Sequence, residues 1–356
     1  MKLKGFLHYT YIFPALAVIY YFLGLMGTGV LYDAIAGVLL TGTVLSAVHH
    51  AEVVAHKVGE PYGMIILALC ITIIEVALII SLMVAGGDQA TTLARDTVFA
   101  AVMIILNGIL GICILVGGVK YHEQFFARTS ATTYLVSIIS ILVLTLVLPN
   151  FTSSVNGPYY NEAQLVFVSI TCLIIYGVFL MVQTVKHRNY FIVANEISGE
   201  HYIPGKMQTT LSFVFLVICL IIVVMMAKGL SGTIEDMVQS IGAPKSLVGV
   251  IIAAVILLPE GIAAIRAARN NQIQSSLNLA LGSALASIGL SIPAVVVVCI
   301  IYDIPLVLGL DKKDIILLSL SVFIVMLSLS RGKTNILYGT VLLMNLAAYI
   351  FTVIVP

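Results

Sequence analysis

The chain alternates long apolar runs with short polar breaks from one end to the other. The runs are about 18 to 26 residues long, which is the length an α-helix needs to cross roughly 30 Å of hydrocarbon. Breaks at charged residues, glycines and prolines predict eleven spans, at residues 6–26, 29–48, 61–86, 93–119, 131–149, 163–184, 208–228, 243–265, 275–302, 314–330 and 334–355. The pattern therefore predicts an all-α membrane protein.

Composition supports the same interpretation. Of the 356 residues, 61% are hydrophobic and 9% are charged, whereas roughly a quarter of an average soluble domain is charged. The chain has 17 basic and 16 acidic residues, so it has no basic face of the kind that binds nucleic acid. The expected surroundings are the lipid bilayer. The first run is too long for a signal-peptide core, so we expect a retained span.

The basic residues are distributed unevenly between the loops on the two sides. When the loops are assigned alternately, one side holds twelve, namely Lys2, Lys4, Lys57, Lys120, Arg128, Lys186, Arg188, Lys206, Arg266, Arg269, Arg331 and Lys333, and the other holds five, namely Arg95, Lys228, Lys245, Lys312 and Lys313. Because cytoplasmic loops are enriched in Lys and Arg, this asymmetry predicts a cytoplasmic N-terminus and an external C-terminus. We expect the cell (inner) membrane as the location.

The longest polar segment, residues 185–207, divides the remaining spans into two groups of five. We therefore expect an N-terminal span at 1–28, a first five-span repeat at 29–184, a cytoplasmic linker at 185–207 and a second repeat at 208–356. An odd number of spans per half inverts the second half relative to the first.

Two acidic side chains, Glu75 and Glu260, lie in the cores of the apolar runs, away from the ends of the spans. A charge at the centre of a bilayer costs about 3 kcal/mol on insertion scales, so such residues usually face a cavity and have a function. Glu75 lies 14 residues after Pro61, and Glu260 lies 16 residues after Pro244. Carboxylates suit a hard cation such as Ca²⁺ and carry protons when the ion is absent, so we expect Glu75 and Glu260 to bind the metal and exchange protons.

Pro259 directly precedes the second acid and removes a backbone donor from a helix interior. We expect it to kink or break this span and so to free carbonyl oxygens beside a cavity, the setting in which non-helical backbone is tolerated at membrane depth.

Three segments resemble the cation/calcium exchanger superfamily, and most closely its bacterial calcium/proton antiporters of the ChaA type. They are His50-Ala51-Glu52-Val53-Val54-Ala55-His56-Lys57-Val58-Gly59-Glu60-Pro61-Tyr62-Gly63, Ile74-Glu75-Val76 and Leu258-Pro259-Glu260-Gly261. After the last come Asn270-Asn271-Gln272 and Asn278-Leu279-Ala280-Leu281-Gly282-Ser283, which resemble the family's Asn-rich turn and Gly-Ser helix. The resemblance implies that Glu75 and Glu260 are the ion-binding acids of two repeats.

The resemblance implies exchange of Ca²⁺ for H⁺ by alternating access. The chain has Thr72 and Leu257 where the wider family commonly has an Asn three residues before each acid, and Ala286 near the place of a family Gln. Transport of Na⁺ or K⁺ against H⁺, or exchange of Na⁺ for Ca²⁺ on the same fold, therefore stays open. No cofactor is expected apart from the transported ions.

Further polar residues are candidates because they lie in the span after a glutamate helix, at the approach to one, or, for Thr72, at the place of a family Asn. We expect Thr72, Asn107, Asn278 and Ser283 to contribute to ion or proton binding. His49, Glu52 and His56 share one helical face if this end of the span is helical, and with Glu60 they are candidates for a cytoplasmic gate or proton access. A transition-metal site at this spacing is an alternative, and so is a plain solvated helix end.

Other function classes lack their signatures in the sequence. There is no GxxxxGK[ST] segment for ATP hydrolysis. There is no HExxH motif or pair of intramembrane aspartates for an enzyme, and no filter for a channel. We therefore expect a secondary transporter and no enzyme.

Overall fold

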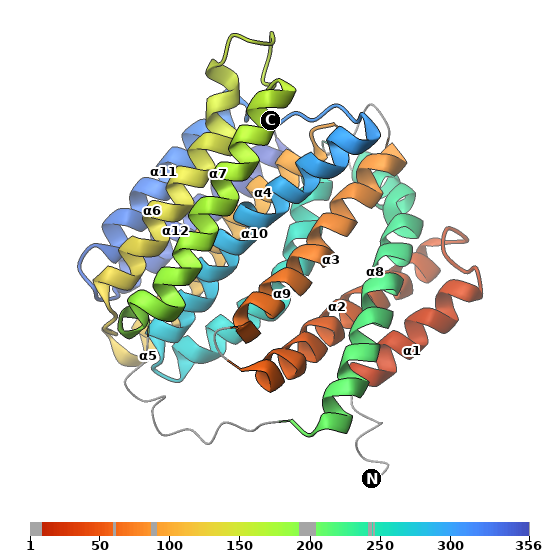
Figure 1. The fold of residues 1–356 in the computed structure, drawn as a ribbon, viewed down its shortest axis with the longest axis horizontal. Helices are drawn as coiled ribbons and strands as arrows, with labels where there is room; N and C mark the ends of the chain where they lie inside the picture. The colour runs from red at the N-terminus through yellow and green to blue at the C-terminus, as the bar shows by residue number, and fades with distance from the viewer. Residues whose placement is uncertain are drawn as a thin grey trace. The chain divides into compact units, whose positions relative to one another are not determined.

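The computed structural model describes residues 9–59, 62–86, 91–191, 204–240, 244 and 246–355. The helices are α1 Tyr9–Phe22, α2 Val30–Val58, α3 Tyr62–Gly86, α4 Leu93–Met103, η3 Ile104–Ile109, α5 Leu110–Tyr121, α6 Arg128–Leu142, η4 Val143–Val147, η5 Leu148–Phe151, α7 Glu162–Met181, η6 Val182–Lys186, η7 Arg188–Tyr190, α8 Lys206–Ser240, α9 Ser246–Arg269, α10 Ile273–Tyr302, α11 Lys312–Leu329 and α12 Ile336–Ile354. Within these ranges the chain forms helices and no named strand (Figure 1).

Each predicted span corresponds to one helix or one continuous series of helices. Helices α4, η3 and α5 continue one another and match a single span, and η4 and η6 extend α6 and α7. Eight helical segments in the described part of the chain are long and apolar enough to cross a membrane. Helix α1 and residues 66–81 of α3 are apolar but shorter, and α11 opens with Lys312, Lys313 and Asp314. The prediction of an all-α membrane fold of about eleven helices is confirmed.

The helix ends differ from the predicted span ends. Helix α2 continues to Val58 instead of ending near residue 48, and α8 continues to Ser240 instead of ending near residue 228. Hydropathy marks only the part of a helix that lies in hydrocarbon, whereas backbone hydrogen bonding continues into the polar region. At about 1.5 Å per residue, the 35 residues of α8 extend over roughly 52 Å.

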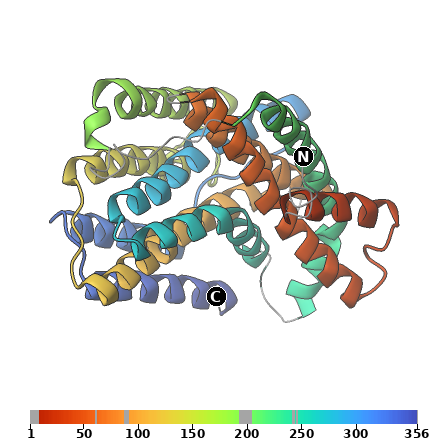
Figure 2. The same cartoon turned by 90° about the horizontal axis from the view of Figure 1, so that it is seen from below.

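The chain divides into two compact units, each drawn from both halves of the sequence. Unit 1 comprises residues 1–90 and 200–248, and unit 2 comprises residues 91–199 and 249–356. In unit 1, helices α1, α2 and α8 pack around an apolar cluster that includes Ala17, Leu39 and Met226 (Figures 1 and 2). The predicted repeat boundaries describe the order along the sequence and are a different division from these units.

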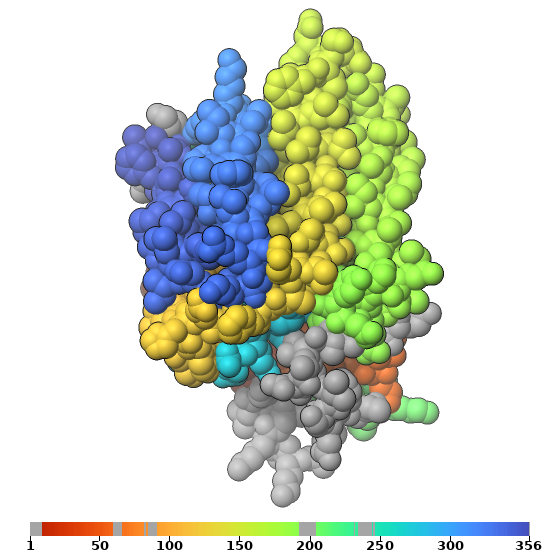
Figure 3. All heavy atoms as spheres, turned by 90° about the vertical axis from the view of Figure 1, so that its left-hand side faces the viewer, coloured from red at the N-terminus to blue at the C-terminus, as the bar shows by residue number. Residues whose placement is uncertain are grey.

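Unit 2 is built around α10 and the continuous rod of α4, η3 and α5. Helix α10 packs against α4, η3, α5, α6 and α7, and α12 packs along α5. Figure 3 shows α6, α7 and α11 side by side on one face, with the loop that follows α5 at their foot. The rod is thus enclosed on several sides, and most of its residues are buried.

The end of α9 is closed by side chains from the end of α5 and the loop after it. Lys120 and Tyr121 each donate a hydrogen bond to the carbonyl oxygen of Arg269 over 2.9 Å, and Gln124 donates to the carbonyl oxygen of Ala268 over 3.1 Å. The last carbonyls of a helix have no partner within it and carry partial negative charge. The Lys120 ammonium therefore stabilises this helix end.

Candidate functional site

Glu75 projects from the buried face of α3. The residue is 3% exposed, and Thr72 and Ile79, one turn to either side of it, are 6% and 0% exposed. Ile73 on the other face is 51% exposed. Helical periodicity thus places Thr72 and Glu75 on the same face of α3. Their proposed role in ion binding stays a prediction.

Glu260 is half-buried on α9, a helix that approaches the rod of unit 2 at two glycines. A Cβ built on Gly261 would lie 3.3 Å from Cδ1 of Ile109 in η3, and one built on Gly249 would lie 3.0 Å from the backbone nitrogen of Thr97 in α4. Two glycines therefore allow α9 to approach the rod closely. This approach brings the turn that carries Glu260 next to η3.

The expected break at Pro259 is absent, because α9 runs without interruption from Ser246 to Arg269. Proline lacks the backbone N–H, so the carbonyl of Val255 receives no intrahelical hydrogen bond from residue 259. The local effect of Pro259 is therefore one carbonyl without its usual donor, in place of a non-helical segment.

Asn107 is fully buried in η3, and its side chain contacts α11 and α12. Its amide nitrogen donates to Oγ of Ser321 over 2.9 Å and to the carbonyl oxygen of Met103 over 3.3 Å. The amide nitrogen of Asn345 lies 3.5 Å from its amide oxygen. The prediction that Asn107 contributes to ion binding stays a prediction, and this amide is already occupied by protein partners.

Asn278 belongs to a polar network at the start of α10. Its amide donates to the carbonyl oxygen of Phe191 over 2.8 Å, and its oxygen accepts from Ser130 over 3.1 Å and from Gln274 over 2.9 Å. Ser283 lies half-buried further along the same helix. The structure thus uses Asn278 to hold the segment that follows α7, with hydrogen-bond partners that differ from those of Asn107.

Comparison with known proteins decides the family. The family model described as sodium/calcium exchanger protein matches residues 28–185 and 211–355. The chain belongs to the sodium/calcium exchanger family. It is a multi-pass membrane protein of a transporter family.

Individual relatives cover almost the whole exchanger. The ionic transporter y4hA of Sinorhizobium fredii is 43% identical over 319 residues, which cover 89% of this chain and 87% of the relative. The sodium-potassium/proton antiporter ChaA of Escherichia coli is 35% identical over 351 residues, which cover 96% and 95%. The native YfkE structure matches with a TM-score of 0.75 at 19% identity over 98% of this chain and 100% of that chain, which shows the shared fold.

The polar end of α2 is helical in this exchanger, so His49, Glu52 and His56 do lie along one face. Glu52 and His56 are exposed and His49 is half-buried, whereas His50 is fully buried and its Nε2 lies 3.0 Å from the carbonyl oxygen of Thr10. Glu60 lies outside the described residues. Within the described ranges, no group of three His, Cys, Asp or Glu side chains is arranged to hold a metal ion.

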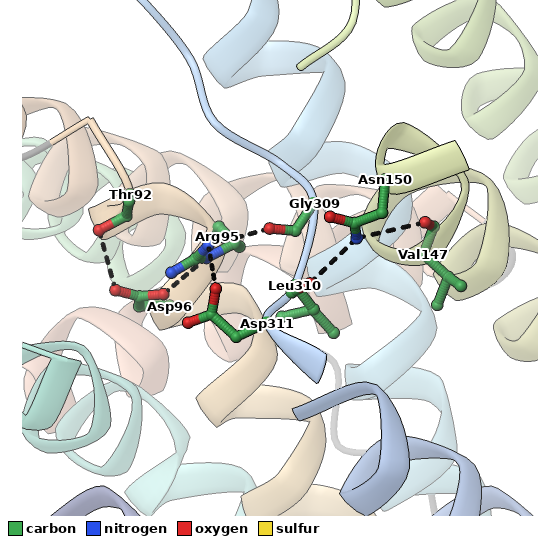
Figure 4. A network of polar contacts seen from close by, with 8 residues as sticks. All are labelled: Thr92, Arg95, Asp96, Val147, Asn150, Gly309, Leu310 and Asp311. Carbon is green, nitrogen blue, oxygen red and sulfur yellow. Dashed lines mark hydrogen bonds and ion pairs between the residues drawn. The ribbon is translucent and has the colours of Figure 1, made fainter. Parts of the chain in front are cut away.

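The predicted site residues do not include a polar network at the start of α4, shown in Figure 4. The alternating loop assignment treats Arg95 as a loop charge, but this side chain is buried, with its Nε 2.8 Å from Asp96 and its Nη1 2.9 Å from the carbonyl oxygen of Gly309. Asp311 lies 3.8 Å away, and Thr92 donates to Asp96 over 3.1 Å. An Arg-Asp pair just inside an apolar run was the available signal, because two neighbouring charges are expensive there without partners.

This network holds the extended segment between α10 and α11. The backbone N–H groups of Val307, Gly309 and Leu310 donate to the carbonyl oxygens of Thr91, Pro158 and Leu146. Asn150 donates to the carbonyl oxygen of Leu310 over 3.0 Å. Non-helical backbone is tolerated in a membrane protein only where its polar groups find partners, and this segment has them.

Proposed function

We propose that the chain is a secondary active cation/proton antiporter, that its first candidate cargo is Ca²⁺, and that Glu75 and Glu260 carry the exchanged ions. The observation that carries the proposal is that the two acids occupy matching positions along their helices. Glu75 is the fourteenth residue of α3 and Glu260 is the fifteenth of α9. Each half of the sequence thus contributes one carboxylate at a similar depth in its helix, within a family of exchangers.

The chemistry follows from the cost of an ionised carboxylate away from water. Such a group is stable when it is protonated or when it binds a cation, and an isolated charge is expensive. Cation binding requires the deprotonated acid and therefore releases protons. Replacing one Ca²⁺ by two protons leaves the total charge at two carboxylates unchanged, which makes proton-coupled calcium exchange a natural use of the pair.

A second candidate is exchange of Na⁺ or K⁺ for H⁺. It is favoured by the 35% identical relative, which is named a sodium-potassium/proton antiporter, whereas the Ca²⁺/H⁺ antiporter of Aphanothece halophytica is 28% identical over 74% of this chain. Ca²⁺ takes six to eight oxygen ligands, and Leu257 supplies none where the wider family commonly has an Asn. Exchange of Na⁺ for Ca²⁺ is a third possibility on this fold.

The remaining assignments are part of the same proposal. Thr72 and Ser283 contribute oxygen ligands or proton relays, and the exposed carboxylate and imidazole of Glu52 and His56 provide proton access from the cytoplasm. The N-terminus lies in the cytoplasm and the C-terminus outside the inner membrane, as the asymmetry of basic loop residues favours. The ions are transported, and no chemical reaction is catalysed.

The test is proton flux from acid-loaded proteoliposomes on addition of Ca²⁺, Na⁺ or K⁺ in turn. We expect Ca²⁺ to release protons with wild type and with Glu162→Gln, a control at an exposed glutamate in the first turn of α7. Glu75→Gln and Glu260→Gln should abolish the release. Normal transport by either variant contradicts the role of that acid, and release by Na⁺ or K⁺ alone replaces the calcium assignment.

A further inference from the structure

A buried polar cluster in unit 2 lies apart from the two acids that carry the ions in the exchange proposed above. It consists of Asn107 in η3, Ser321 in α11 and Asn345 in α12, which are 0%, 0% and 8% exposed. We call these three residues the amide clamp. Their side chains meet each other across more than 200 positions of sequence, since the Asn107–Ser321 and Asn107–Asn345 separations are 214 and 238 residues.

The hydrogen bonds of the clamp occupy most of the polar capacity of the Asn107 side chain. The amide nitrogen donates to Ser321 Oγ at 2.9 Å and to the Met103 carbonyl at 3.3 Å, and the amide oxygen faces the Asn345 amide nitrogen at 3.5 Å. Ser321 in turn donates to the carbonyl oxygen of Leu317 over 2.7 Å. Buried amides are costly unless they are hydrogen-bonded, so this arrangement fixes η3 against α11 and α12.

The clamp coincides with a change of helical type. Residues Ile104–Ile109 form a π-helix, and the N–H of Leu110 bonds to the carbonyl of Ile105. A π-turn carries one more residue than an α-turn and is often found at functional sites. Within this π-helix, Asn107 contacts α11 and α12, while Ile109 contacts α9.

Glycines bring α12 close to the rod beside the clamp. A Cβ on Gly108 would lie 2.9 Å from Cδ2 of Leu346, and a Cβ on Gly111 would lie 3.2 Å from the carbonyl oxygen of Gly339. Small residues at a helix crossing allow backbones to approach and pack tightly. The side of η3 that faces α12 is therefore held by both packing and hydrogen bonds.

The other side of η3 supports the turn that carries Glu260. Ile109 Cδ1 would be 3.3 Å from a Cβ on Gly261, the residue after Glu260. Because protein interiors are closely packed, a shift of η3 must be accommodated at this contact. The position of the acid on α9 thus depends on how η3 is held two residues away.

We propose that Asn107, Ser321 and Asn345 are positioning residues, which hold the π-turn so that Ile109 sets the place of Glu260 and thereby the cation affinity. None of the three needs to touch the ion. The inference rests on the proposed function for its transport readout, and it has a second readout that does not depend on transport.

The first measurement compares cation-driven proton flux for Asn107→Ala, Ser321→Ala and Asn345→Ala. We expect each to raise the half-saturating cation concentration by roughly three- to ten-fold, the size of one lost hydrogen bond, with little change in maximal rate. The Asn107→Ala, Ser321→Ala double variant should be no worse than the single variants, because groups in one network are not additive. Ser319→Ala is the matched control, since Ser319 is exposed on α11 and bonds only to its own helix at Ile315.

The second measurement is hydrogen exchange of the same purified proteins without transported cation. Faster exchange in residues 104–110 and 255–265 of the clamp variants, and not of Ser319→Ala, supports positioning. A defect confined to Asn107→Ala, with normal Ser321→Ala and Asn345→Ala, makes Asn107 an ion ligand and overturns the clamp. Unchanged hydrogen exchange in all three variants also overturns it. Faster hydrogen exchange in the clamp variants, together with a wild type that moves no protons, contradicts the antiport function alone.

Discussion

Gly111 of α5 and Gly339 of α12 lie backbone to backbone at the crossing of their helices. A Cβ on Gly339 would lie 2.7 Å from the carbonyl oxygen of Gly111 and 2.6 Å from the backbone nitrogen of Leu115, and real Cβ atoms essentially never come so close. Since the obstructing atoms are backbone, a larger side chain cannot be accommodated by a rotamer change. The two helices would have to separate.

We therefore expect Gly339→Ala to destabilise the protein by about 1–3 kcal/mol, the usual cost of overpacking. Gly177→Ala is the matched control, because Gly177 lies in α7 with open space around its Cα, and it should gain up to about 1 kcal/mol from reduced chain entropy. Thermal unfolding in detergent measures both. Equal melting temperatures for Gly339→Ala and wild type would show that the crossing is looser than described.

The Arg95–Asp96 pair leads to a prediction about paired removal. Arg95→Met leaves the Asp96 carboxylate, whose side chain is 13% exposed, without its cation, and we expect a loss of about 3 kcal/mol because a buried charge is then uncompensated. Adding Asp96→Asn removes that charge and should recover a large part of the loss. A double variant that melts as low as Arg95→Met would instead assign the loss to the hydrogen bond between Arg95 and Gly309.

The segment after α7 is held by an aromatic residue. Phe191 is 7% exposed and contacts the rings of Tyr134 and Phe179. Phe191→Ala should cost about 3 kcal/mol of local stability, so trypsin should cut more quickly after the exposed Lys186 and Arg188. Tyr190→Ala, at a neighbouring exposed ring, is the control. Identical digestion of Phe191→Ala and wild type would mean that this contact does not hold the segment.

Ligand binding gives a prediction that is independent of flux. A cation that binds the folded exchanger at 100 times its dissociation constant stabilises it by about 2.7 kcal/mol. We expect Ca²⁺ to raise the melting temperature of wild type and of Glu162→Gln, and to have little effect on Glu75→Gln and Glu260→Gln. If Ca²⁺ stabilises all four equally, it binds elsewhere on the surface.

The number and order of helices could be predicted from the sequence because lipid imposes a simple demand on each span. The ends of α2 and α8 could not, since Val58 and Ser240 lie beyond the apolar residues that mark the spans. The burial of Glu75 could also be predicted, because the residues around it in the sequence are apolar. Its 3% exposure agrees with an acid that occupies the inner face of an apolar helix.

Contacts between distant positions were beyond sequence reasoning. Asn107 was a candidate ion ligand because of where it follows Glu75 in the chain, but its partners Ser321 and Asn345 are polar residues in apolar runs that no local pattern connects to it. The π-turn around it has no sequence signature of the kind that a capping box has. The capping box at Asn161 and Gln164, by contrast, is formed by residues three apart in the sequence.

The division into units has a consequence for biosynthesis. The chain passes from one unit to the other at residues 90–91, 199–200 and 248–249, so neither unit is a continuous stretch. During translation, unit 1 lacks α8 until the ribosome has passed residue 240, and unit 2 lacks α12 until it has passed residue 354. Helices inserted early must therefore wait in the bilayer for partners that are synthesised much later, and during that interval their buried faces are in contact with lipid.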